Sequence, residues 1–232
     1  MLTKRHYGRA TIYGVLLTLV IIVGAACSKA GGSSGEAGSV RDVQTNGPAA
    51  RSPLDAVVLK PADVGPAAIS RTIQGGQEVA GQVTLDLCNA AYASEALRTA
   101  RLQVAFLDGA GHMGASNEIV SYRPGGTRRA YRELTAAAGR CPGSYRERGA
   151  TVSHIRFGPH VRRLGARQLV VSVLFSETSG PGHAWSAAVY QFRENLFSGV
   201  YAFGGTRRAA LRLALRLGAM SAARLRVATA RS

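Results

Sequence analysis

The stretch WSAAVYQFRENLFSGVYAFGGTRRAALRLALRLGAM, residues 185–220, contains the pattern that decides the fold. Apolar residues alternate with small or polar ones in two arms, which begin at Trp185 and Leu196 and flank the tripeptide at 193–195. Such alternation around a short polar break predicts a β-hairpin. From Thr206 to about Leu225 the apolar residues recur at helical spacing instead, behind a Gly-Gly-Thr turn that suits a helix start. The stretch therefore predicts two paired strands followed by a helix.

Part of this pattern occurs twice. YRPGGTRRA begins at Tyr122, YAFGGTRRA begins at Tyr201, and nine of 18 aligned positions are identical through Gly139 and Gly218. The first copy predicts a helix over 127–140 with Thr127 as its N-cap. Either a strand–turn–helix unit has been duplicated, or the match arose by chance in a chain rich in Arg and Gly.

Strands are also predicted elsewhere. Period-two alternation occurs at Val83-Leu85-Leu87, Leu102-Val104-Phe106 and Leu169-Val171-Val173-Phe175, and Ile119, Val120 and Tyr122 fall in a further apolar run. Together with the two helices, this predicts an α+β fold, in which two helices from the duplicated unit pack on an antiparallel β-sheet.

The N-terminus has the form of a bacterial export signal. Residues 1–9 carry three cations and no acid, and residues 10–26 form an uncharged apolar run that ends in small residues before Cys27. This resembles a lipobox, so we expect a lipoprotein signal peptide at 1–26 and a fatty-acylated (palmitate) Cys27. An uncleaved signal anchor and ordinary secretion are the alternatives. All three place the remaining chain outside the cytoplasm, and the first predicts a lipid-anchored protein on the extracytoplasmic face of the cell membrane.

The next segment, 27–52, is rich in Gly, Ser and Ala and has no apolar period, which predicts a flexible tether. The folded domain then spans 53–232. It contains two cysteines, Cys88 and Cys141, and in an oxidising compartment these are expected to form one disulfide. Two separate buried thiols are the alternative. Two thiols without a His or Cys at ligand spacing predict no metal site.

The charge is strongly positive. The chain has 29 Lys and Arg against 13 Asp and Glu, a formal charge of +16, and 26 of these cations are Arg. Removal of the signal peptide leaves +13, and residues 123–232 hold 19 cations against four acids. Because an exported chain does not meet nucleic acid, we expect no nucleic-acid partner, but rather an anionic lipid or cell-wall polymer. A GC-rich genome, which favours Arg codons, explains the same composition.

Two kinds of anion site are predicted from this charge. Each Gly-Gly-Thr-Arg-Arg turn combines glycine, a hydroxyl and two guanidinium groups at a helix start, which are groups that bind anions. The candidate residues are Gly126, Thr127, Arg128 and Arg129 in the first turn, and Gly205, Thr206, Arg207 and Arg208 in the second. Arg208, Arg212 and Arg216 also form one basic face of the C-terminal helix. The alternatives are an ordinary capped turn and an ordinary solvated helix face.

No catalytic residues are assigned, because the chain has no GxSxG, HExxH, GxGxxG, Walker A or CxxC motif. Ser116, Asn117 and Glu118 precede an apolar run and are candidates to line a cleft. We expect no enzyme activity and no cofactor.

Four segments carry a resemblance to a known family. LDLC (85–88), SEALRTARLQV (94–104), SNEIVSYRPGG (116–126) and CP (141–142) resemble actinobacterial lipoproteins and sensor domains related to the extracellular domain of PknH-type receptor Ser/Thr kinases. The resemblance covers roughly 54–228. It implies an antiparallel sheet with helices against it, a ligand cleft and no catalysis.

The expected function is therefore a membrane-anchored, non-catalytic ligand-binding or sensor-like domain that recognises an anionic envelope component. An envelope hydrolase with a dispersed active site and a structural or partner-binding envelope protein are the alternatives. The sequence does not predict the oligomeric state.

Overall fold

The computed structural model describes residues 52–147, 149–165, 167–177 and 182–230. The predicted signal peptide, Cys27 and nearly all of the tether lie outside these residues. No helix in the described part of the chain is long and apolar enough to cross a membrane.

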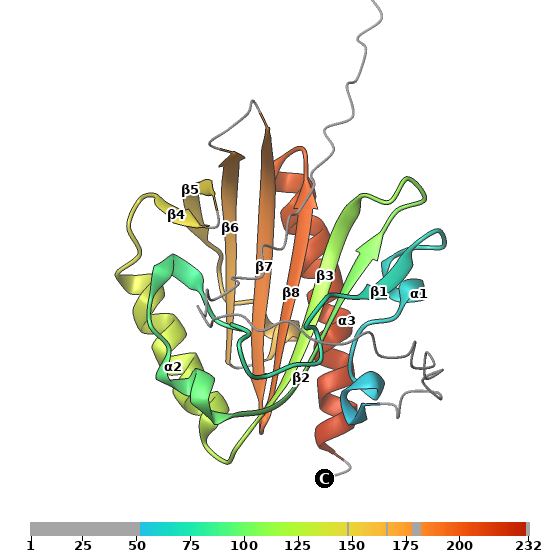
Figure 1. Cartoon of the computed structure of the whole chain (residues 1–232), viewed down its shortest axis with the longest axis vertical. Coiled ribbons are helices and arrows are strands. Elements are labelled where there is room, and N and C mark those ends of the chain that lie inside the picture. The colour runs from blue at the N-terminus through green and yellow to red at the C-terminus, as the bar shows by residue number, and fades with distance from the viewer. Residues whose placement is uncertain (1–51, 148, 166, 178–181, 231–232) are drawn as a thin grey trace, which may run out of the picture. The chain divides into compact units, whose positions relative to one another are not determined.

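Eight antiparallel strands form one sheet in the order β1-β2-β3-β8-β7-β6-β5-β4 (Figure 1). The strands are β1 (Ile69–Thr72), β2 (Arg98–Leu107), β3 (Met113–Tyr122), β4 (Tyr145–Glu147), β5 (Ala150–Phe157), β6 (Arg167–Glu177), β7 (His183–Arg193) and β8 (Leu196–Gly204). The helices are α1 (Pro61–Val64), α2 (Gly126–Gly139) and α3 (Arg207–Thr229), and the 3-10 turns are η1 (Pro53–Ala56), η2 (Leu87–Asn89), η3 (Ala93–Leu97) and η4 (Arg162–Leu164). The α+β prediction is confirmed.

Side-chain alternation divides the core into two layers, one on each face of the sheet. On β7, Ala187 and Val189 face α3, whereas Ala188 and Tyr190 belong to the layer beneath α2. The long helix α3 thus covers one face together with η1, and α2 covers part of the other (Figure 1). Gly218 lets α3 lie close to the sheet, because an added Cβ there would meet Val189 Cγ1 at 2.9 Å.

One predicted strand is wrong. Residues 83–87 do not join the sheet, although Leu85 and Leu87 are buried. They belong to residues 73–97, here called the roof segment, which crosses the α2 face of the sheet (Figure 1). A disulfide between Cys88 and Cys141, the expected pair, joins the roof segment to the end of α2, with the two Cα atoms 5.3 Å apart.

Candidate functional site

The two Gly-Gly-Thr-Arg-Arg turns begin their helices at different positions. In α3, Thr206 is the N-cap, and its Oγ1 accepts a hydrogen bond from the Ala209 N–H at 3.2 Å. In α2, Gly125 is the N-cap with φ of 81°, so the predicted cap at Thr127 is wrong. The Thr127 hydroxyl instead donates to the carbonyl of Glu194 in the β7–β8 turn. The threonine of the repeated sequence therefore caps the helix in the second copy, whereas in the first copy it forms a hydrogen bond to a neighbouring turn.

The structure does not bring the two turns together. They follow β3 and β8, which are antiparallel neighbours, so the turns lie at opposite ends of the sheet. Arg128, Arg129, Arg207 and Arg208 are all exposed. Arg129 pairs with Glu133 at 2.8 Å, and Arg207 Nε donates to Ser172 Oγ at 2.9 Å. Gly126 is buried and Gly205 is exposed. The two turns are separate candidates and do not form one anion site.

Two arginines on α3 have contacts that the basic-face prediction missed. Arg216 donates to the carbonyls of Asp63 and Val64 at 2.9 and 2.8 Å, and Arg224 forms an ion pair with Asp63 at 2.7 Å. The hydrogen bonds from Arg216 satisfy two carbonyl groups at the C-terminus of α1, which have no partner within the helix. Together with the ion pair of Arg224, they hold α1 against α3. Part of the basic face is therefore used within the domain.

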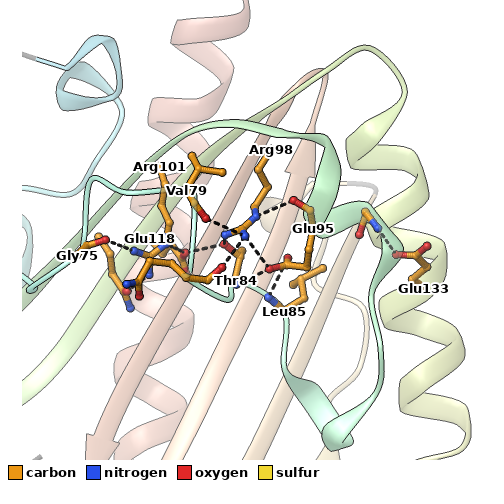
Figure 2. Close-up of polar contacts among 12 residues, drawn as sticks. Gly75, Val79, Thr84, Leu85, Glu95, Arg98, Arg101, Glu118 and Glu133 are labelled. Atoms are coloured by element: carbon orange, nitrogen blue, oxygen red, sulfur yellow. Dashed lines mark hydrogen bonds and ion pairs between the residues drawn. The ribbon is translucent and has the colours of Figure 1, made fainter. Parts of the chain in front are cut away.

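A buried polar network lies between the sheet and the roof segment (Figure 2). At its centre, Glu118 on β3 is 2% exposed and accepts hydrogen bonds from Arg101 Nε at 2.5 Å and Thr84 Oγ1 at 2.8 Å. Arg101 also donates to the Gly75 carbonyl at 2.8 Å and to the Gln103 side chain. The network therefore joins β2 and β3 to the start and the middle of the roof segment.

A second group of contacts extends this network toward α2. Glu95 accepts hydrogen bonds from the backbone N–H groups of Thr84 and Leu85 at 2.8 and 3.3 Å. Arg98 donates to Thr84 Oγ1 and to the carbonyls of Val79 and Gln82, the latter at 2.5 Å. At residues 79–85 of the roof segment, these hydrogen bonds with side chains take the place of the backbone bonds that a strand would make to its neighbour.

Burial controls the electrostatics of this network. It raises the pKa of Glu118 to about 7, and the facing guanidinium of Arg101 opposes that rise. Burial likewise raises the pKa of Glu95, against backbone hydrogen bonds that lower it. Glu118 and Arg101 are both enclosed, at 2% and 5% exposure, so neither can meet a substrate without movement of the roof segment.

The predicted cleft at 116–118 is wrong for the same reason. Ser116 and Glu118 are buried, Glu118 lies beneath the roof segment, and Asn117 points to the opposite face of the sheet from Glu118. Asn117 Oδ1 accepts from the Leu59 N–H at 2.9 Å, and its Nδ2 donates to Ser198 Oγ and the Gly199 carbonyl. It fastens β3 to β8 and to the segment after η1, which is a structural role.

A small open hollow is found at the end of the sheet that holds the β7–β8 turn. Its volume is about 140 Å³, and three of its lining residues are arginines from separate elements: Arg167 at the start of β6, Arg193 at the end of β7 and Arg226 in the last turns of α3. Glu194 is the acidic residue that lines it. Sequence reasoning missed this hollow, because its residues are far apart in the chain.

No group of three or more His, Cys, Asp or Glu in the described ranges is placed to hold a metal ion. The histidines of the described chain are not gathered into such a site.

Comparisons with known proteins give a weak resemblance of fold. No family model matches the chain, and no curated protein matches it. Among solved structures, it is similar to the extracellular domain of PknH from Mycobacterium tuberculosis, at 12% sequence identity and a TM-score of 0.45, covering 72% of this chain and 93% of that chain. This is a weak likeness of fold to the sensor domain expected from the sequence, and it carries no argument about function.

Proposed function

We propose that this protein is a lipid-anchored, extracytoplasmic component of the cell envelope whose domain binds an anionic envelope component without catalysing a reaction. The export pattern before Cys27 supports the location. The disulfide between Cys88 and Cys141 also supports it, because such bonds persist in oxidising compartments.

The observation that carries the binding proposal is the surplus of exposed arginine. Residues 123–232 hold 19 cations and four acids. The exposed arginines of that half, within the described ranges, are Arg123, Arg128, Arg129, Arg132, Arg140, Arg146, Arg156, Arg162, Arg163, Arg193, Arg207, Arg208, Arg212, Arg216 and Arg226. A surface of one sign attracts oppositely charged polymers and membranes over a distance of about a Debye length.

A binding measurement on residues 52–232 tests this function. The domain should sediment with vesicles of phosphatidylcholine mixed with phosphatidylglycerol, or bind an anionic wall polymer, and should not bind pure phosphatidylcholine. Binding should weaken steeply between about 0.1 M and 1 M salt, where the Debye length falls from about 10 Å to about 3 Å. Absent or salt-insensitive binding would remove the electrostatic function.

The anchor has a separate test. Growth with a labelled fatty acid should mark the full chain and leave Cys27→Ala unmarked. Label that persists in the variant contradicts anchoring at Cys27 and leaves the domain's binding unaffected.

A further inference from the structure

The hollow between the start of β6, the end of β7 and the last turns of α3 is lined by three arginines and supported by buried hydrogen bonds. Apart from its arginines, Gln191 and Glu194, its walls are apolar or small: Leu164, Gly165, Phe192, Ala222 and Leu225. Three arginines from different elements therefore line a space of about 140 Å³ that is closed on one side by the core.

None of the three arginines forms an ion pair with a carboxylate among the described residues. Arg193 Nε donates to Thr229 Oγ1 at 2.8 Å, and Arg226 reaches the Arg163 carbonyl at 3.5 Å. These contacts help to hold the side chains of Arg193 and Arg226 in position and do not neutralise their charges. Holding three cations around one small space is unfavourable unless an anion enters it. Glu194 offsets one of the three charges and leaves an excess of two.

The frame beneath the arginines is built from two buried glutamines. The Gln168 amide donates to the carbonyls of Val161 and Gly165, at 2.8 and 2.5 Å. The Gln191 amide donates to the carbonyls of Leu164 and Gly218, at 3.1 and 3.0 Å. These bonds fix the loop that contains η4 against β7 and α3, so the hollow is formed before a ligand arrives.

Gln191 also supplies an observation that points to a ligand. It lines the hollow and is 1% exposed, yet its Oε1 has no hydrogen-bond partner in the described structure. A buried acceptor without a donor is costly and uncommon. A hydroxyl of a ligand, or a water that the ligand holds in place, is the donor that would satisfy it.

Arg226 has a further effect on the site. It lies close to the C-terminus of α3, where the partial negative charge of the helix dipole would repel an anion, and its guanidinium offsets that charge. Arginine is also the side chain whose planar fork matches the oxygens of a phosphate group.

We propose that this hollow binds the phosphate group of a phosphorylated polyol, with Arg167, Arg193 and Arg226 as the phosphate-binding residues. The proposal rests on the anion-binding function above and gives that function a site and a ligand class. A phospholipid headgroup and a phosphate-containing wall polymer present the same chemistry.

Titration with sn-glycerol 3-phosphate tests the site directly. In residues 52–232, its binding should shift the backbone amide NMR signals of Gly165, Gln191 and Glu194. Arg167→Gln and Arg193→Gln should each weaken binding about tenfold, because each removes a charge-assisted bond to the phosphate. Arg132→Gln and Arg156→Gln remove the same charge from exposed positions on α2 and β5 and should change binding by less than about twofold.

The NMR spectrum of each free variant reports whether the domain is folded, so a folding defect is recognised. Equal weakening by all four variants would overturn the site, since the effect would then come from net charge. Shifts that map to the turns at Gly126 or Gly205 would also overturn it. Glycerol itself should bind more weakly than its phosphate, and equal binding contradicts the role of the arginines.

Vesicle binding separates this proposal from the more general one. The double variant that combines Arg167→Gln with Arg193→Gln is compared with the wild-type domain. If both bind phosphatidylglycerol vesicles equally well, the hollow is not the binding site, and the general anion-binding function stands. If the wild type binds neither vesicles nor polymer, the general function fails. Loss of vesicle binding in the double variant identifies the lipid as the source of the phosphate, and loss of polymer binding alone identifies the polymer.

Discussion

Replacement of Glu118 by Gln should change how the stability of the domain depends on pH. Burial raises the pKa of Glu118 from its ordinary value of 4.5 to about 7 in the folded protein. Between these values the folded state binds more protons than the unfolded state, so the free energy of unfolding falls as the pH rises. The stability that this group contributes is therefore complete below pH 4.5 and is lost as the pH passes 7. The difference between the two pKa values corresponds to roughly 3 kcal/mol.

Glu118→Gln removes this dependence because the amide does not titrate. Below pH 4.5 the folded wild type carries a neutral carboxyl of nearly the same shape, so we expect the variant to be within about 1 kcal/mol of it. Toward pH 8 the variant should gain up to roughly 3 kcal/mol relative to the wild type. Urea unfolding of residues 52–232 at several pH values measures the difference, and the other carboxyl groups, which both proteins share, largely cancel.

The opposite slope would refute this reasoning. If the Arg101 guanidinium, 2.5 Å from Glu118 Oε1, outweighed burial, the wild type would gain stability with rising pH, and Glu118→Gln would lose several kcal/mol at pH 7. Arg101→Met provides an independent check. It removes the group that opposes the rise in pKa, so its cost should be larger at pH 8 than at pH 5.

Three further predictions concern contacts that fasten the domain together. Replacing both Cys88 and Cys141 by Ser opens a loop of 53 residues and should cost about 4 kcal/mol in urea unfolding, while added reductant, which weakens the wild type, should leave the variant unchanged. Arg216→Gln should lower the free energy of unfolding by about 1 kcal/mol and speed amide hydrogen exchange in α1. Arg212 is exposed one helical turn away, and Arg212→Gln should change neither quantity. Asn117→Ala removes three buried hydrogen bonds and should cost roughly 3 kcal/mol by the same unfolding assay; a cost below about 1 kcal/mol would contradict its structural role.

The sequence predicted those parts of the fold in which the alternation of side chains coincides with regular secondary structure. The hairpin at 185–203 has long, clean alternation, and both arms are central strands, β7 and β8. The helices at 127–140 and 206–225 were predicted to within one residue at their starts, and α3 continues four residues further. Periodicity failed at 83–87, because an irregular segment laid across a sheet also buries apolar side chains, here Leu85 and Leu87, whereas Val83 is exposed and Thr84 is buried.

The strand β5 was missed for the opposite reason. It lies near the edge of the sheet, and among Ala150–Phe157 only Val152 is fully buried, so its sequence has little alternation to detect. Because β4 pairs only with residues 150–152, the rest of β5 lies at the edge of the sheet, where strands are partly solvated and tolerate polar residues such as Arg156. The duplicated unit was predicted as two strand–helix units on one sheet, and the helices lie on its opposite faces.

The candidate sites depend on register, which the sequence did not predict. Arg101 and Glu118 are 17 residues apart on neighbouring strands. A charged residue within each of two apolar strands was a detectable sign of a buried pair. Arg167, Arg193 and Arg226 had no such sign, because they meet only where β6, β7 and the end of α3 converge.

The central position of the β3–β8 pair has a consequence for how the chain folds. The hairpins β2–β3 and β7–β8 each join neighbouring segments, whereas β3 meets β8 only when residues about 80 apart come together, as Asn117 does with Ser198 and Gly199. Closing a long loop carries an entropic cost that is recovered only after the contacts form. We therefore expect two hairpin halves to form early and their docking along β3 and β8 to limit the folding rate.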